Sequence, residues 1–215
     1  MTLPIIAILN PKGGSGKTTI STNLARALHE RDRKVLIVDS DPQGSARDWH
    51  AADEGNPLPL VALDRANNVK SLVDVAGGYD FVVIDGAAKL EDMIAATIKV
   101  ADIVLIPVTP SPYDLWAATD LVDFVKARRE ITDGKPKASF VISRAIAGTR
   151  LGEEISAALA EHELNVFGTH IVQRQVYPQT ASEGRTVFDA RNADALREIN
   201  ALADEVLAFA GTESA

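Results

Sequence analysis

The sequence predicts an α/β fold: a doubly wound, mostly parallel sheet with helices on both faces. Continuous Val/Ile/Leu runs, without polar alternation, are typical of strands that are buried on both faces. These runs alternate regularly with segments of helical periodicity, as in repeated β-α units. A glycine-rich loop joins the first run to the first helical segment. We expect a single domain over residues 1–210 and a flexible tail at residues 211–215.

The elements are expected in strict alternation. The predicted strands are residues 4–9, 34–38, 58–63, 81–84, 103–108, 138–142 and 164–171. The predicted helices are residues 18–31, 46–52, 69–76, 91–100, 115–131, 151–162 and 194–209. Because crossovers between parallel strands are right-handed, the carboxyl ends of the strands meet at one edge of the sheet. Ligands of open α/β sheets bind at that edge, so we searched the strand ends for reactive side chains.

The first strand leads into Lys-Gly-Gly-Ser-Gly-Lys-Thr at residues 12–18. The glycines allow consecutive N–H groups to curl around an anion, and the following helix N-terminus adds partial positive charge. Such a phosphate-binding loop (P-loop) predicts a nucleoside triphosphate ligand, and we expect ATP with Mg²⁺. Lys17 is expected to reach the terminal phosphates and the Thr18 hydroxyl to bind Mg²⁺. The predicted nucleotide-binding residues are Lys12, Gly13, Gly14, Ser15, Gly16, Lys17, Thr18 and Thr19.

This loop departs from the common Gly-x-x-x-x-Gly-Lys-Ser/Thr form, because Pro11 replaces the first glycine and Lys12 follows it. In this deviant form the sequence resembles the ParA/MinD family of P-loop ATPases, and within it the small ParF-like plasmid partition ATPases. The resemblance implies a P-loop NTPase fold and a homodimer in the ATP state. It also implies that Lys12 contacts the nucleotide of the partner subunit, so Lys12 joins Lys17 among the predicted catalytic residues. The alternative is that Lys12 is a solvated loop charge.

Two further strand ends carry acids. The second predicted strand leads into Asp-Ser-Asp-Pro-Gln-Gly at residues 39–44, which resembles the switch I segment of the ParA family. The resemblance implies that Asp41 orients the attacking water and that Asp39 lies near the water shell of the metal. Either acid could instead cap the following helix. The fourth strand ends at Asp85 after four apolar residues, a Walker B pattern, and Asp85 is expected to hold Mg²⁺ through a water.

Two later segments resemble the ParF-like group less specifically. The first is the proline-rich stretch at residues 106–114, which by resemblance lies near nucleotide and dimer contacts. The second is residues 173–177, which by resemblance lies close to the nucleotide base, so Arg174 and Gln175 are predicted cofactor-binding residues. The alternative is that both loops only pack against the sheet.

Composition restricts the function classes. The chain has no cysteine, which excludes disulfides, Fe–S clusters and thiol catalysis, and its histidines show no metal-ligand spacing. The net charge of −8 is unlike that of a dedicated nucleic-acid binder, so DNA contact would need a local basic patch. The candidates are Lys126, Arg128, Arg129, Lys135 and Lys137, or arginines 144, 174, 185 and 191 assembled across a dimer; the alternative is ordinary surface charge. No secretory signal or apolar run of about 20 residues is present, so we expect a cytoplasmic protein, nucleoid-associated in the ATP state.

The resemblance implies a partition ATPase. Its ATP dimer would bind DNA nonspecifically, and a centromere-binding ParB/ParG-like adaptor would stimulate slow hydrolysis to segregate a plasmid or chromosome. One alternative is a MinD-like or other positioning ATPase that acts on a membrane or a protein cargo. The acids of the last predicted helix (Asp194, Glu198, Asp204 and Glu205) disfavour an anionic membrane. A third alternative is a small-molecule ATP-dependent synthetase, for which we find no obvious substrate pocket.

Overall fold

The structure is a computed structural model that describes residues 3–69, 71–88, 91–149 and 151–211. Its centre is a seven-stranded sheet in the order β3-β2-β4-β1-β5-β6-β7, and each pair of neighbouring strands is parallel. This confirms the predicted fold class. The strands are β1 (Ile5–Ile8), β2 (Val35–Asp39), β3 (Leu60–Ala62), β4 (Phe81–Asp85), β5 (Ile103–Val108), β6 (Lys137–Ala145) and β7 (Asn165–Val172).

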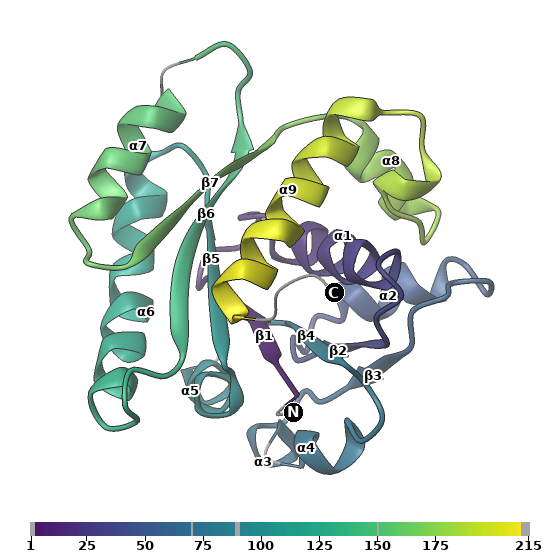
Figure 1. The fold of residues 1–215 in the computed structure, drawn as a ribbon, viewed down its shortest axis with the longest axis horizontal. Coiled ribbons are helices and arrows are strands. Elements are labelled where there is room, and N and C mark those ends of the chain that lie inside the picture. The colour runs from purple at the N-terminus through teal and green to yellow at the C-terminus, as the bar shows by residue number, and fades with distance from the viewer. Residues whose placement is uncertain (1–2, 70, 89–90, 150, 212–215) are drawn as a thin grey trace.

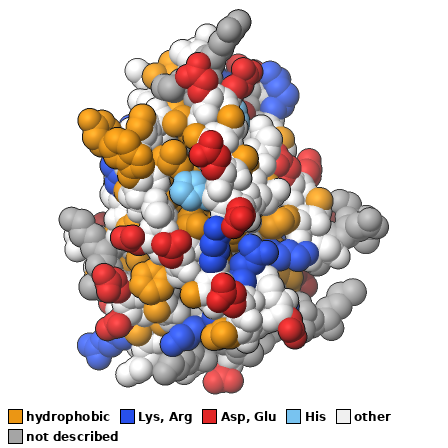
Figure 2. Space-filling model, turned by 90° about the vertical axis from the view of Figure 1, so that its left-hand side faces the viewer, with side chains coloured by type: hydrophobic (Ala, Val, Ile, Leu, Met, Phe, Trp, Pro, Cys, Tyr) orange, Lys and Arg blue, Asp and Glu red, His pale blue; other side chains and the backbone are white. Residues whose placement is uncertain are grey.

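Helices cover both faces of the sheet (Figure 1). One face carries α1 (Lys17–His29), α2 (Ser45–Ala51), α8 (Val176–Ser182), the 3₁₀ turn η1 (Val187–Asp189) and α9 (Ala193–Ala210). The other carries α4 (Leu72–Val75), α5 (Glu91–Val100), α6 (Pro112–Glu130) and α7 (Leu151–Ala160), and α3 (Ala66–Val69) packs against α5. Figure 2 looks onto the side of α6 and α7, where Lys and Arg side chains lie among Asp and Glu.

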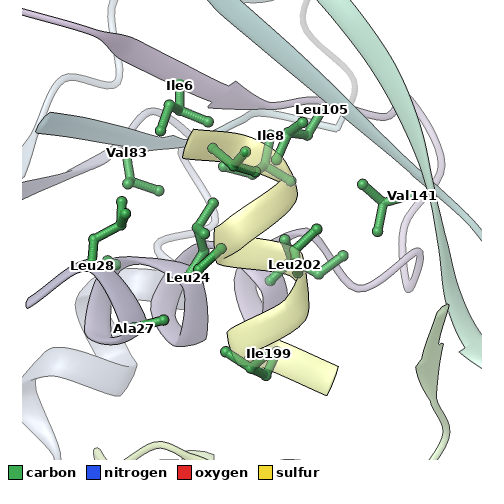
Figure 3. Packing of buried hydrophobic residues seen from close by; sticks show 14 of the residues in the cluster. Ile6, Ile8, Leu24, Ala27, Leu28, Val83, Leu105, Val141, Ile199 and Leu202 are labelled. Atoms are coloured by element: carbon green, nitrogen blue, oxygen red, sulfur yellow. The ribbon is translucent and has the colours of Figure 1, made fainter. Parts of the chain in front are cut away.

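The buried core explains why the strand runs are continuous. Along β1, Ile6 and Ile8 face α1 and α9, whereas Ile5 and Ala7 face the opposite helical layer. Figure 3 shows the first of these clusters, in which Leu24 of α1 packs among side chains from the sheet and from α9. Since both faces of each central strand are covered, both alternating side-chain sets must be apolar. Burial of each such side chain contributes about 1.5–3 kcal/mol.

Several predicted boundaries are wrong. The helix predicted at residues 69–76 is replaced by the separate short helices α3 and α4, and Lys70 between them lies outside the described residues. Helix α6 begins at Pro112, three residues earlier than predicted, because proline fits the first turn of a helix. Helix α8 was not predicted. In the predicted tail, Gly211 caps α9 with φ +75°, and residues 212–215 lie outside the described residues.

The topology brings the reactive strand ends together. Strand β1 lies between β4 and β5, at the point where the chain changes from building one half of the sheet to building the other. A crevice forms at such a switch point outside the carboxyl ends of the strands. The P-loop follows β1 directly. In the same register Asp85 of β4 is opposite Ile8 of β1 on one side and Asp39 of β2 on the other.

Candidate nucleotide-binding site

The P-loop is held in place by side chains from two neighbouring strand ends. The buried Asn10 donates its Nδ2 to the Pro107 carbonyl at 2.7 Å and accepts the Lys12 N–H at 2.8 Å. From the end of β6, Ser143 Oγ donates to the Ser15 carbonyl at 2.5 Å, and Arg144 Nη1 donates to the Gly14 carbonyl at 3.0 Å. The carbonyls of Gly14 and Ser15 therefore already accept hydrogen bonds from side chains of β6.

The other polar groups of the loop remain available to a ligand. Gly14 and Gly16 have φ of +78° and +91°, in the left-handed region that favours glycine. Within the described part of the chain, no group accepts a hydrogen bond from the backbone N–H groups of residues 13–16. The Ser15 hydroxyl is buried and also has no partner there. This free donor set in front of a helix N-terminus fits a phosphate group.

A cavity of about 1070 Å³ extends from the loop and is large enough for a whole nucleotide. At one end it is lined by Gly13, Gly14, Gly16, Lys17, Thr18 and Thr19 together with Asp41. At the other end it is lined mainly by apolar residues such as Ile171, Tyr177 and Pro178. The phosphates would therefore lie at the P-loop and the base at the apolar end.

Thr18 and Asp85 are brought together as the sequence predicted. Thr18 Oγ1 donates to Asp85 Oδ2 at 2.7 Å, and Ser21 Oγ donates to Asp85 Oδ1 at 3.0 Å. Complete burial raises the pKa of Asp85 to about 7, although both hydroxyl bonds oppose the rise. A hydroxyl and a carboxylate side by side suit Mg²⁺, which keeps several waters and takes phosphate oxygens as further ligands. Consistent with that sharing, no cluster of three or more acidic or histidine side chains that could hold a metal alone occurs among the described residues.

In this structure the ammonium group of Lys17 contacts a backbone carbonyl of the P-loop. Its Nζ donates to the Lys12 carbonyl at 3.2 Å. Burial lowers the pKa of Lys17, and the charges of Asp85 and Asp41 oppose that change. A buried cation with only a carbonyl acceptor is well suited to bind phosphate oxygens.

The two predicted switch I acids have different surroundings. Asp39 is fully buried, and its carboxylate accepts the N–H groups of Asp41 at 3.0 Å and Arg47 at 2.9 Å. Burial raises the pKa of Asp39, against these bonds and the Arg47 charge. Asp41 is half-buried, lines the large cavity and accepts the Gln43 N–H at 3.0 Å. Asp41 therefore faces the space where phosphates would lie, whereas Asp39 organises the loop.

Lys12 points to a different hollow. Its side chain forms an ion pair with the buried carboxylate of Asp114, which also accepts the hydroxyl of Thr109. Lys12 lines a second hollow of about 330 Å³ beside the first cavity, together with Arg144 and Ile146. Of these three side chains, only that of Arg144 also lines the larger cavity.

Arg174 and Gln175 both line the large cavity, at the end away from the phosphate loop. Arg174 Nη2 donates to Glu198 at 2.5 Å, an interaction that raises the pKa of Arg174. Glu198 also accepts the Val172 N–H at 3.1 Å, so α9 holds the end of β7 and the loop that follows it. Burial raises the pKa of Tyr177 in the same wall.

The predicted basic clusters lie apart from this site. Lys137 begins β6 and is therefore at the opposite edge of the sheet, where its Nζ donates to the Phe209 carbonyl at 2.7 Å. Lys126 and Lys135 are paired with acids, and Arg128 and Arg129 donate to carbonyls. Lys and Arg side chains on the side seen in Figure 2 are interspersed with acidic ones. A small group of adjoining Lys and Arg side chains near the middle of this face is bordered by acidic side chains.

Several residues that shape the site were missed from the sequence: Ser21, Arg47, Asp114, Ser143 and Glu198. Asp114 lies inside the proline-rich segment that attracted attention, but no spacing rule connects it to Lys12. Arg47 carries a weak signal, because a cation in the first turn of a helix is unfavourable and needs a nearby acid. Arg144 was considered only as a DNA contact, whereas in the structure it binds the P-loop.

A P-loop at the switch point of a parallel sheet, with a Thr–Asp pair below it, defines a P-loop nucleoside-triphosphate-binding protein. Residues 6–187 match the family model of the CobQ/CobB/MinD/ParA nucleotide binding domain. The chain belongs to this family. It is an ATPase, as the sequence predicted, and Thr18 and Asp85 are the residues that would hold Mg²⁺.

Similar proteins include a carboxysome distribution protein and partition proteins. Maintenance of carboxysome distribution protein A from Halothiobacillus neapolitanus is 35% identical over 94% of this chain and 95% of its own length. The chromosome-partitioning ATPase Soj of Thermus thermophilus is 28% identical over 94% of this chain and 95% of its own length. The structure of a putative plasmid partition protein from Borrelia burgdorferi, bound to AMPPNP, superposes with a TM-score of 0.79 at 20% identity, over 96% of this chain and 99% of that one. Among the described residues no helix is both long and apolar enough to cross a bilayer.

Proposed function

We propose that this ATPase positions a large cellular cargo: ATP joins two copies into a dimer that binds DNA nonspecifically, and hydrolysis separates them. The observation that carries this proposal is the placement of Lys12. Its side chain is 42% exposed and lies outside the cavity that would hold the chain's own nucleotide. A lysine in a P-loop that does not face its own nucleotide is free to bind the nucleotide of a second copy.

The surroundings of Lys12 support a contact between two copies. The hollow that it lines is open and contains the exposed Ile146. Tyr113 and Trp116 flank the lysine's partner Asp114 in α6, and both are largely exposed. Exposed aromatic and other apolar side chains that lie close together are typical of protein–protein interfaces.

The nature of the cargo is supported by the relatives. The 35% identical relative is a carboxysome distribution protein, which favours a protein body as the cargo. The 28% identical Soj is a chromosome-partitioning ATPase, which favours a replicon as the second candidate. In either case we propose a separate adaptor, ParB/ParG-like for a replicon, that links cargo and ATPase and stimulates hydrolysis. The acids of α9 disfavour attachment of this helix to an anionic membrane, so we propose a cytoplasmic protein that associates with the nucleoid in the ATP state.

The first test is dimerisation. Size-exclusion chromatography with light scattering should show a monomer without nucleotide and a dimer with Mg²⁺ and a nonhydrolysable ATP analogue. Lys12→Gln should bind the analogue and stay monomeric. Lys135→Gln, at the opposite edge of the sheet, is the matched control and should dimerise normally. A wild-type chain that remains monomeric at high concentration would refute the proposal.

The second test is DNA and cargo. The ATP-bound dimer should retain nonspecific duplex DNA, and retention should fall steeply as salt rises, because phosphate contacts release counterions. Because the net charge is −8, the basic surface has to be completed by the second subunit, so Lys12→Gln should abolish retention. The ATPase rate should then rise when the adaptor encoded beside this chain is added. Dimerisation without DNA binding would refute the proposed DNA-binding surface but would not refute the nucleotide-dependent dimer.

A further inference from the structure

Arg47 makes an unusual number of contacts with the loop that carries Asp41. Its Nη2 donates to the Asp41 carbonyl at 2.9 Å and to the Pro42 carbonyl at 3.2 Å. Its Nε lies 3.3 Å from Asp39, and its Nη1 lies 3.4 Å from Asp64, just beyond β3. One planar guanidinium therefore contacts two loop carbonyls and the ends of two strands.

The position of Arg47 is not explained by helix stability. It is the third residue of α2, where the positive end of the helix disfavours a cation. The buried Asp39 offsets that cost, because its carboxylate accepts the Arg47 N–H and forms an ion pair with the Arg47 guanidinium. Gly44 also fits this arrangement: its φ is +75°, and a Cβ there would lie 3.0 Å from the guanidinium. The loop thus approaches Arg47 as closely as a glycine allows.

The contacts fix the backbone of Asp41 on both sides. The Asp41 N–H donates to Asp39 Oδ1 at 3.0 Å, and its carbonyl accepts both Arg47 and the Gly44 N–H, the latter at 2.9 Å. With both peptide groups held, the direction in which the carboxylate leaves the main chain is set. That carboxylate lines the large cavity at its phosphate end.

We propose that Arg47 is a positioning residue for ATP hydrolysis: its fork over the Asp41 and Pro42 carbonyls holds Asp41 where it orients the attacking water. This inference rests on the proposed role of Asp41, and Arg47 itself contacts neither nucleotide nor water. A displacement of about 1 Å in such a group costs up to about a hundredfold in rate. Loss of Arg47 should therefore act on the chemical step and leave ATP binding almost intact.

The test is a double-mutant cycle of single-turnover ATP hydrolysis. Arg47→Gln should lower the rate constant at least about tenfold, with the Kd of a fluorescent ATP analogue changed by less than about threefold. In the Asp41→Asn background, the same Arg47→Gln change should alter the remaining rate by less than about twofold, because its effect acts through Asp41. Arg47→Lys keeps the charge, but one nitrogen cannot contact the two loop carbonyls together with Asp39 and Asp64, so this variant should also be slow. Arg197→Gln, which removes a surface arginine of α9, is the matched control and should hydrolyse normally.

The outcomes distinguish the proposed role of Arg47 from the proposed role of Asp41. Equal slowing by Arg47→Gln with and without Asp41 would overturn the inference, because an effect on general stability is independent of Asp41. If Arg47→Gln does not fold, as judged by circular dichroism, Arg47→Lys carries the same cycle. A slow Asp41→Asn with a normal Arg47→Gln would overturn the role of Arg47 alone. Normal hydrolysis by Asp41→Asn would overturn the role of Asp41 and the inference with it, while leaving the dimer test untouched.

Discussion

Replacement of Asp85 by asparagine is expected to stabilise the nucleotide-free protein above neutral pH while removing its use of Mg²⁺. Asp85 is 1% exposed and ends β4, and within the described residues its carboxylate accepts hydrogen bonds from the hydroxyls of Thr18 and Ser21. An ionised carboxylate there loses more hydration than two hydroxyls restore, which is why its pKa rises to about 7. An asparagine side chain has the same shape and carries no charge to desolvate.

The magnitude follows from linkage. The pKa rises from an ordinary 3.8 to about 7, which corresponds to about 4 kcal/mol of cost for the ionised form. The folded state binds this proton more tightly than the unfolded state does. The cost is therefore absent below about pH 4, grows between about pH 4 and pH 7, and is constant above. That cost already includes the attraction of Lys17. Because asparagine offers one oxygen to the two hydroxyls that donate to Asp85, we expect a net gain of about 2 kcal/mol at pH 8.

The assay is urea unfolding of both proteins in EDTA at pH 5, 6, 7 and 8. The difference in unfolding free energy, Asp85→Asn minus wild type, should increase with pH and level off near pH 8. Asp123→Asn, which changes an exposed carboxylate of α6, should give a difference that does not vary with pH. A difference for Asp85→Asn that is the same at pH 5 and pH 8 would show that burial does not hold the proton on this carboxyl.

Three further predictions concern single contacts. Lys17→Ala should lower phosphate release from ATP by at least about a hundredfold, because it removes the buried cation at the phosphate end of the cavity. Gly86→Ala should lower the urea-unfolding free energy by about 1–3 kcal/mol, since a Cβ there would lie 2.2 Å from Leu9 Cδ2; an unchanged midpoint would contradict this packing. Glu198→Gln should weaken binding of a fluorescent ATP analogue about three- to tenfold at unchanged saturating rate, because it frees the Arg174 loop. The control for Glu198→Gln is Glu205→Gln. Glu205 lies in the same helix and accepts the N–H groups of Gly168 and Thr169, and its replacement should leave that affinity unchanged.

Much of the site could be predicted because its chemistry lies in consecutive residues at strand ends. The P-loop carries its donors within seven residues, so its conformation follows from the glycines and the start of α1. Asp85 and Asp39 could be placed beside it because parallel strands bring their carboxyl ends to one edge. The register confirms this placement, with Asp39 opposite Asp85.

The rest depends on contacts that no local rule specifies. Asp114 lies 102 residues after Lys12, and their contact requires the end of β5 and the start of α6 to be placed beside the P-loop. Helix α8 has seven residues with Pro178 in its first turn, which is too short and too irregular for a periodic signal. The sequence indicates only that the acids of α9 disfavour an anionic membrane, whereas in the structure Glu198 and Glu205 bind backbone N–H groups of β7.

The contacts of Lys12 connect the two hollows of the site through one residue. Its carbonyl accepts Lys17, the cation of the larger cavity, while its side chain pairs with Asp114 in the smaller hollow. Phosphates that draw Lys17 away leave that carbonyl without its donor, and Lys12 is then held by the hydrogen bond from its N–H to Asn10 Oδ1 and by its ion pair with Asp114. Binding of a nucleotide in the chain's own cavity therefore changes the contacts that hold Lys12. A second copy that brings its own phosphates to the smaller hollow has to compete with the buried carboxylate of Asp114 for this half-exposed lysine, and the exchange leaves that carboxylate with the hydroxyl of Thr109.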